Sequence, residues 1–185
     1  RSQNLFMLQT RSNSYAFGID NQGLVRHLYW GSRSQCEWKI SNAGAAEVST
    51  NDPVYEITKE EFPVYGGLRY KEHCLKVTFA DGTRDVAYEY VNYEIQKNEQ
   101  CEELVIILKD KHYALVMELH YKIYEAYDLM ERFVVLKNES TEVMQIEKLH
   151  SGQFHVPYEG LNFRNVHGHW GAEQQKFVQK VDYGK

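Results

Sequence analysis

The sequence has little of several features that mark other classes of protein. Only three prolines and three cysteines occur in its 185 residues. The cysteines, Cys36, Cys74 and Cys101, lie far apart and form no CxxC pair, so we predict free thiols and neither a disulfide framework nor a zinc site. Free thiols favour a reducing compartment, and we therefore expect a cytoplasmic protein, with secretion as the alternative.

Long apolar segments and basic clusters are also missing. The longest apolar run is Leu104–Leu108, whereas a membrane-spanning helix needs roughly 20 such residues, so we expect no membrane partner. The formal net charge is −5 and the isoelectric point is about 5.9, which makes nucleic acid an unfavourable partner. The chain opens at Arg1 without a methionine or a leader pattern, so we expect a processed or excised piece.

Aromatic residues, by contrast, are abundant, at 14% of the chain with 14 tyrosines. Aromatic and β-branched residues suit half-buried strands, and many alternate with polar residues. The predicted strand segments are 5–9, 15–19, 24–30, 73–79, 84–95, 103–110, 113–124 and 129–137, with 142–152 closing the block. Hairpin turns that pair the flanking strands are expected at 20–23 and 80–82, and a long surface loop is expected at 32–52.

The predicted fold is therefore all-β, a sandwich of antiparallel sheets. A helix over residues 113–136 is the main competitor, but it gives a poorer apolar stripe than a strand with alternate apolar residues at Leu115, Met117, Leu119 and Tyr121. Segment 103–110 is apolar on both faces, so we expect it to be a central strand.

No residue pattern predicts a self-contained catalytic site. His167 and His169 flank a glycine next to Trp170, but a third metal ligand is missing, so we interpret them as part of a glycine-rich loop. Glycoside hydrolysis needs two facing carboxyls, and turns already explain Asp81 and Asp110. Neither a nucleophile elbow nor a phosphate-binding loop is present. We predict no catalytic residue, no metal and no cofactor.

The large aromatics remain to be explained. They serve either the protein's own core and domain contacts or the stacking of sugar rings, which have apolar C–H faces. The candidates are Tyr29, Trp30, Trp38, Tyr65, Tyr70 and Trp170.

Several phrases in order along the chain carry a resemblance to one family. They include "SYAFGIDNQGLVRHLYWG" (14–31), "EFPVYGG" (61–67), "LHYKIYE" (119–125) with "DLMER" (128–132), "LHSGQFHVP" (149–157) and "HGHWGAE" (167–173). Together they resemble the N-terminal domain of glycoside hydrolase family 36, the α-galactosidases.

The resemblance implies a β-supersandwich of the galactose-mutarotase type, of which residues 1–185 are an incomplete fragment. It also implies a catalytic (β/α)8 barrel downstream, which holds the two aspartates of a retaining mechanism and is absent here, so this chain alone is expected to be inactive. Its partners would be its own barrel, neighbouring subunits of a homo-oligomer and, through the parent enzyme, α-galactosides. Tyr29, Trp30, Tyr65 and Trp170 would be substrate or interface anchors. We also expect the fragment to self-associate through exposed sheet edges.

Departures from the family pattern leave alternatives open. Leu68-Arg69-Tyr70 stands where the family often has Asp-Phe-Arg, and neither Glu37, Glu47 nor Asp52 aligns clearly with an acidic residue that helps a neighbouring sugar site. A preference for α-galactosides or for α-N-acetylgalactosaminides is therefore undecided. Two other functions compete: an autonomous carbohydrate-binding module and an aldose-epimerase-like enzyme. The latter would draw its acid and base from residues such as His120, His150, His155, His167 and His169.

Overall fold

The structure, a computed structural model, describes residues 4–40, 59–66, 71–156 and 160–181. It divides into two compact units, Arg1–Phe154 and His155–Lys185, which are treated separately below. The strands are β1 (Leu5–Gln9), β2 (Asn13–Ile19), β3 (Val25–Ser32), β4 (Leu75–Thr78), β5 (Tyr88–Lys97), β6 (Glu102–Asp110), β7 (Leu115–Tyr124), β8 (Leu129–Asn138), β9 (Gln145–Leu149), β10 (Asn162–His169) and β11 (Ala172–Lys180).

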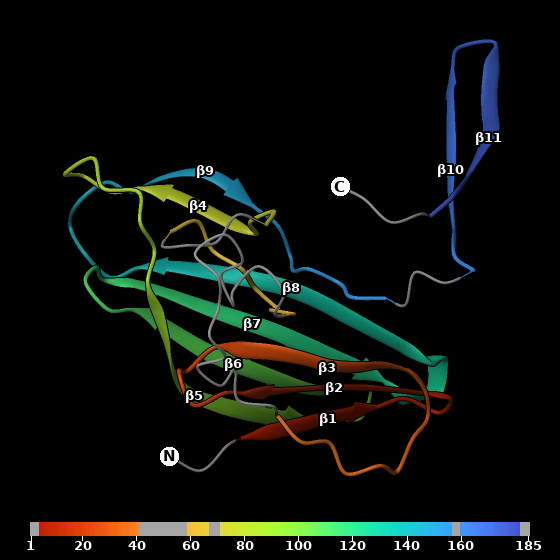
Figure 1. The fold of residues 1–185 in the computed structure, drawn as a ribbon, viewed down its shortest axis with the longest axis horizontal. Helices are drawn as coiled ribbons and strands as arrows, with labels where there is room; N and C mark the ends of the chain where they lie inside the picture. Colours follow the sequence, from red (N-terminus) through yellow and green to blue (C-terminus); the bar gives the residue numbers. More distant parts are fainter. Residues whose placement is uncertain (1–3, 41–58, 67–70, 157–159, 182–185) are drawn as a thin grey trace, which may run out of the picture. The chain divides into compact units, whose positions relative to one another are not determined.

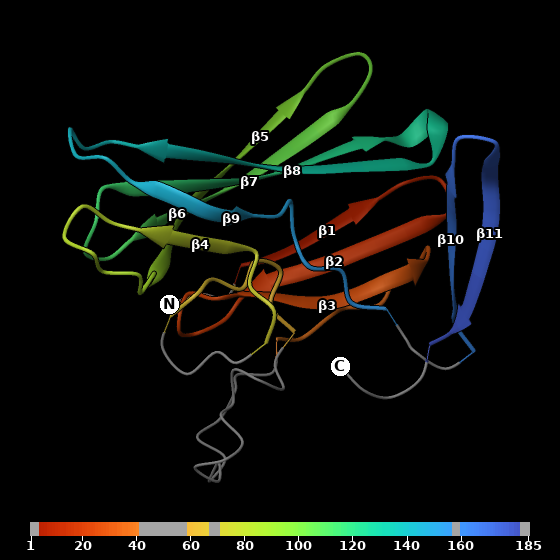
Figure 2. The same cartoon turned by 90° about the horizontal axis from the view of Figure 1, so that it is seen from above.

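The first unit is a β-sandwich, as the sequence predicts. A three-stranded sheet in the order β1-β2-β3 faces a four-stranded sheet in the order β5-β6-β7-β8, and all of these pairs are antiparallel (Figures 1 and 2). A separate antiparallel pair, β4-β9, completes the unit. The described residues contain one short 3-10 helix, Glu125–Tyr127, and no helix capable of crossing a bilayer.

The opening hairpin forms where the sequence predicts it. Asp20 closes the turn because its Oδ1 accepts hydrogen bonds from the backbone N–H groups of Gln22 and Leu24, both at 2.9 Å. Gly23 follows with a φ of 84°, a left-handed conformation that glycine adopts without steric cost. The turn therefore sets β2 and β3 side by side, which places their buried residues over the second sheet.

The four-stranded sheet follows the predicted alternation. Leu115, Met117, Leu119, Tyr121 and Ile123 of β7 are each at most 8% exposed, and all but Ile123 belong to the main core. Strand β6 lies between β5 and β7, which confirms its predicted central place. The core is filled from both sheets; for example, the rings of Phe17 and Tyr121 stack at 4.7 Å.

One predicted pairing is wrong. The turn at 80–82 forms, with Phe79 N–H donating to Thr83 O at 2.9 Å, but the strands on either side of it do not pair with each other. Strand β4 pairs with β9, and β5 pairs with β6. The chain is redirected after the turn, because Val86 N–H bonds to Tyr65 O at 2.9 Å before β5 begins.

The second unit is an antiparallel hairpin of β10 and β11. The predicted glycine-rich loop around His167 and His169 is therefore wrong, because both histidines lie at the end of a strand. Alternation of apolar and polar residues did not identify these strands, because polar residues occupy both of their faces. All β10 residues are exposed, and Trp170 at the turn is 95% exposed. Among the described residues, no group of three or more His, Cys, Asp or Glu side chains is placed to hold a metal ion.

Candidate functional site

A buried carboxylate, Glu61, joins the two sheets of the sandwich. Its side chain is fully buried and accepts hydrogen bonds from the hydroxyls of Tyr15 (2.7 Å) and Tyr121 (3.0 Å). His27 Nδ1 lies 2.8 Å from Glu61 Oε1, and Arg132 Nη1 lies 2.7 Å from Oε2. Because Tyr15 and His27 come from one sheet and Tyr121 and Arg132 from the other, the carboxylate links both. We call these residues the Glu61 cluster.

Arg132 supplies the positive charge that a buried carboxylate requires. Its side chain is 2% exposed, its Nη2 donates to the Glu61 carbonyl oxygen at 2.6 Å, and its guanidinium lies 4.9 Å from the centre of the Tyr121 ring. Burial alone would raise the pKa of Glu61, but the hydrogen bond from His27 and the charge of Arg132 bring that pKa below its usual value. Burial and the Glu61 charge raise the pKa of Tyr15 and of Tyr121. The cluster is therefore built for an ionised Glu61 with neutral tyrosines.

Strand irregularity and register explain how the cluster assembles. The β2–β3 pairing slips between Ala16 and Phe17, so that Phe17 pairs with His27 but Tyr15 pairs with Trp30. This bulge at Leu28 turns His27 and Trp30 to the same face, although they are three residues apart. In the other sheet Tyr121 pairs directly with Arg132, so both side chains point inward.

The phrases between residues 14 and 132 that carry the family resemblance all supply part of this cluster. Tyr15 belongs to "SYA", His27 to "HLYWG", Glu61 to "EFPVYG", Tyr121 to "LHYKIYE" and Arg132 to "DLMER". The phrases are widely separated in the sequence, and the fold brings one side chain of each to a single buried point. Sequence reasoning singled out none of these residues as a site. The available signal was Arg132, a charge on an otherwise apolar strand face.

A cleft of about 330 Å³ opens at the rim of the sandwich beside the Glu61 cluster. Its aromatic wall holds Trp30 and Phe154, whose rings lie 5.7 Å apart at 47°. Tyr15 also lines it, and the Arg132 guanidinium lies 5.5 Å from the centre of the Phe154 ring. Trp30 is 40% exposed and Phe154 is 47% exposed, so both rings are open to solvent.

Asn13 and Asp128 form a polar wall of the cleft, beside the apolar side chains of Leu8, Ile123, Leu129 and Met130. Asp128, which closes the β7–β8 connection with a left-handed φ of 56°, accepts a hydrogen bond from Ser12 N–H at 3.0 Å and another from Ser12 Oγ. Asn13 Nδ2 lies 3.4 Å from Asp128 Oδ2. These hydrogen bonds lower the pKa of Asp128, so it stays ionised and holds the β1–β2 connection in place.

The predicted anchors do not all belong to this cleft. Trp30 lines it, whereas the Tyr29 ring stacks on Trp38 at 4.5 Å and its hydroxyl donates to Ser32 O at 2.9 Å. Gly31 allows this fold-back, because a Cβ there would lie 2.7 Å from the Tyr29 hydroxyl. Tyr65 packs against His73 and lies beneath Lys76 and Arg84.

The remaining candidates are distributed elsewhere. Trp170 belongs to the hairpin unit. Tyr70, Leu68-Arg69-Tyr70, Glu47 and Asp52 lie outside the described residues. The histidines considered for an epimerase are divided between the units, with His120 on β7 beside Glu103 (2.8 Å) and His155, His167 and His169 in the second unit.

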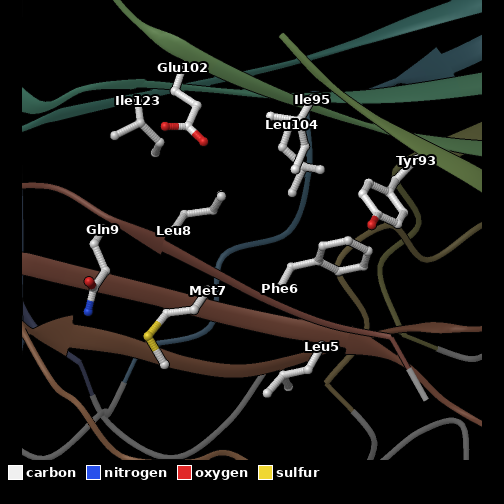
Figure 3. A pocket seen from close by; sticks show the side chains of 10 residues that line it. All are labelled: Leu5, Phe6, Met7, Leu8, Gln9, Tyr93, Ile95, Glu102, Leu104 and Ile123. Atoms are coloured by element: carbon white, nitrogen blue, oxygen red, sulfur yellow. The ribbon is translucent and has the colours of Figure 1, made fainter. Parts of the chain in front are cut away.

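A second hollow, of about 400 Å³, lies between β1 and the four-stranded sheet, and most of the residues that line it are apolar (Figure 3). Phe6 and Leu8 point from β1 toward Leu104, and the rings of Phe6 and Tyr93 meet edge to face at 5.1 Å. Tyr93 is 41% exposed and Ile95 is 57% exposed, and both lie on β5, which is an edge strand of its sheet. This side of the sandwich therefore combines an exposed strand edge with exposed apolar side chains.

These features define an all-β sandwich domain whose charged interior is closed and whose rim carries open aromatic surface. The family model described as "Glycosyl hydrolase family 36 N-terminal domain" matches residues 23–185. The chain belongs to this family.

Known proteins agree with the assignment. The chain is 25% identical to "Probable alpha-galactosidase G" of Aspergillus terreus and 20% identical to "Alpha-galactosidase AgaA" of Geobacillus stearothermophilus, covering 97% and 91% of this chain but 26% of each relative. Its fold matches crystal structures of the Lactobacillus brevis α-galactosidase (TM-score 0.81, 21% identity) and of AgaA (TM-score 0.82, 19% identity). The chain covers 28% of each of those structures, and each alignment spans 97% or more of this chain. It therefore spans about a quarter of the length of these relatives.

Proposed function

We propose that this domain is the non-catalytic N-terminal part of a retaining α-galactosidase-like glycoside hydrolase. It packs on a catalytic barrel elsewhere in the parent protein and supports the oligomer and the rim of the active site. The matching relatives are named as α-galactosidases and are about four times as long as the matched region, which supports a division of labour between domains.

The observation that carries the non-catalytic assignment is the closure of the Glu61 cluster. A retaining glycosidase needs two carboxyls on either side of an accessible sugar. Glu61 is buried and already paired with Arg132, so it has no access to a substrate. Among the described residues that line the Trp30 cleft, Asp128 is the only carboxylate, and its hydrogen bonds keep it ionised. A single ionised carboxylate cannot supply both an acid and a nucleophile.

Hydrolysis of a chromogenic α-galactoside tests this proposal. The 185-residue chain and the full-length parent are assayed in parallel at equal molar concentration. We expect release of the chromophore by the parent and none above buffer by the chain. Turnover by the chain that survives repurification would overturn the proposal and would redirect attention to Asp128 and the surface histidines.

The oligomer and the compartment are further parts of the proposal. The exposed β5 edge with Tyr93 and Ile95 supports contact with a neighbouring subunit or domain. Light scattering after size exclusion should give a mass above the 21.8 kDa of one chain, and a stable monomer would contradict this.

The compartment rests on the free thiols of Cys36, Cys74 and Cys101. Free thiols support a cytoplasmic location, which cell fractionation of the parent protein tests.

A further inference from the structure

We propose that the cleft lined by Trp30, Phe154 and the β1–β2 connection, which Asp128 holds in place, binds a single neutral pyranose ring. This inference is independent of the proposed function, because a sugar can bind this domain whether or not the parent is an α-galactosidase. It assigns the sugar-stacking role to Trp30 and adds Phe154, which the sequence did not single out.

The two walls of the cleft match the two kinds of surface that a pyranose has. The Trp30 and Phe154 rings, tilted by 47° and 5.7 Å apart, form an open apolar wall for the C–H face of the sugar. Asn13 supplies a polar side chain for the hydroxyl rim, whereas Thr10 and Ser14 also line the cleft but are buried and hydrogen-bonded within the protein. The volume of about 330 Å³ lies at the small end of the range of roughly 300–1,000 Å³ typical of ligand pockets. It therefore suits one ring rather than an extended chain.

The polar wall has a fixed acceptor for a sugar hydroxyl. Asn13 Nδ2 donates to Ser12 Oγ at 3.0 Å and lies 3.4 Å from Asp128 Oδ2, so the nitrogen end of the amide faces Asp128. The carbonyl end of the same amide consequently points away from Asp128 and can accept a hydroxyl hydrogen. Because Asp128 already receives both donors of Ser12, its role is to position this loop.

The aromatic wall is equally well fixed. Tyr15 lies beneath Trp30 with ring centres 6.1 Å apart, and its hydroxyl is held by Glu61. Arg132 lies against Phe154 and is itself held by Glu61. The Glu61 cluster thus supports both rings, so little side-chain freedom is lost when a ligand binds.

Charge restricts the ligand class. Asp128 is ionised, and the charge of Arg132 is paired with that of Glu61. The cleft is therefore negative, which disfavours phosphorylated or carboxylated sugars. A neutral hexoside satisfies the aromatic wall and the polar wall without this repulsion.

The test is a titration of the 185-residue chain with methyl α-galactopyranoside and methyl α-glucopyranoside, followed by calorimetry and by the NMR signals of the tryptophan indole groups. We expect millimolar affinity and a shift of the Trp30 signal, with Trp170 unchanged. Galacturonate, the anionic analogue, should bind more weakly. Trp30→Ala and Phe154→Ala should each weaken binding about tenfold or more, whereas Trp170→Ala should leave it unchanged.

Both substitutions alter residues at least 40% exposed, so circular dichroism should show retained folding. Should Trp30→Ala fail to fold, Phe154→Ala alone decides the question. Absence of binding by the folded wild-type chain would overturn the proposal. So would affinity that both cleft variants retain, or that Trp170→Ala abolishes.

Discussion

The sandwich unit and the β10–β11 hairpin use the same antiparallel strand geometry but differ in what they bury. In the sandwich, Leu119 and Tyr121 are fully buried, and so are the charged Glu60 and Glu61. In the hairpin, every β10 residue is exposed, including Phe163 at 57% and Val166 at 59%. A two-stranded hairpin is at most marginally stable by itself in water. Strand pairing is common to both units, whereas only the sandwich adds a buried core in which the Glu61 carboxylate is paired with Arg132 and hydrogen-bonded by Tyr15 and Tyr121.

Substitution of the buried Arg132 should lower the unfolding free energy of the sandwich the most. Arg132→Ala leaves the Glu61 carboxylate buried without its partner, which costs roughly 3–5 kcal/mol of unfolding free energy. Urea denaturation followed by tryptophan fluorescence measures this. The matched control is Arg164→Ala, an exposed arginine in β10, for which we expect a change within about 0.5 kcal/mol. Equal effects of the two substitutions would contradict the importance that we assign to the buried cluster.

Removal of one hydroxyl from the cluster should have a smaller effect. Tyr121→Phe keeps the ring stacked on Phe17 but removes the hydrogen bond to Glu61 Oε2, at an expected cost of about 1–3 kcal/mol. Tyr124→Phe is the control in the same strand, because that hydroxyl donates to the exposed Glu131. The control should change stability by less than about 1 kcal/mol. Chemical denaturation of both variants distinguishes a buried hydrogen bond from an exposed one.

Acid should destabilise the sandwich in part through Glu61. The folded-state pKa of Glu61 is below its ordinary value of 4.5, so the ionised group contributes stability above that pH. This contribution is lost as the pH falls from 4.5 toward the lower folded pKa, because protonation favours the unfolded chain. Glu147, whose pKa the Arg84 hydrogen bond lowers to about 2, acts in the same direction.

A pair of variants isolates the buried contribution to acid unfolding. Glu61→Gln should be less stable at neutral pH and should lose less further stability on acidification than the wild type. Glu147→Gln should alter the profile only slightly, because the Arg84–Glu147 pair is partly exposed and screened by solvent. Urea midpoints measured across the acidic range test both expectations. An unchanged pH profile for Glu61→Gln would argue against an ionised Glu61.

Much of the sandwich was predictable because one face of each long strand is buried. Alternation identified β7, and the Asp20–Gly23 turn identified the first hairpin. Two features of the site were not predictable from a repeating pattern. The bulge at Leu28 changes which face His27 and Trp30 occupy, and Glu61 lies outside the regular strands, where periodicity gives no information. The hairpin was missed for the opposite reason, since without a buried face its strands need no alternation.

The smallest effect is expected in the hairpin itself. Phe177→Ala removes a ring that is 45% exposed in β11, so the unfolding free energy of the sandwich should change by no more than about 0.5 kcal/mol. Phe17→Ala, which removes a fully buried ring, should cost about 3–5 kcal/mol in the same assay.

Native-state hydrogen exchange measures the same difference between the two units. The β6 and β7 amides should be protected to near the global stability, and the β10 and β11 amides should exchange rapidly. Protected hairpin amides in the isolated chain would show that another surface covers these strands in solution. In that case Phe177→Ala would abolish the protection while leaving β6 and β7 unchanged.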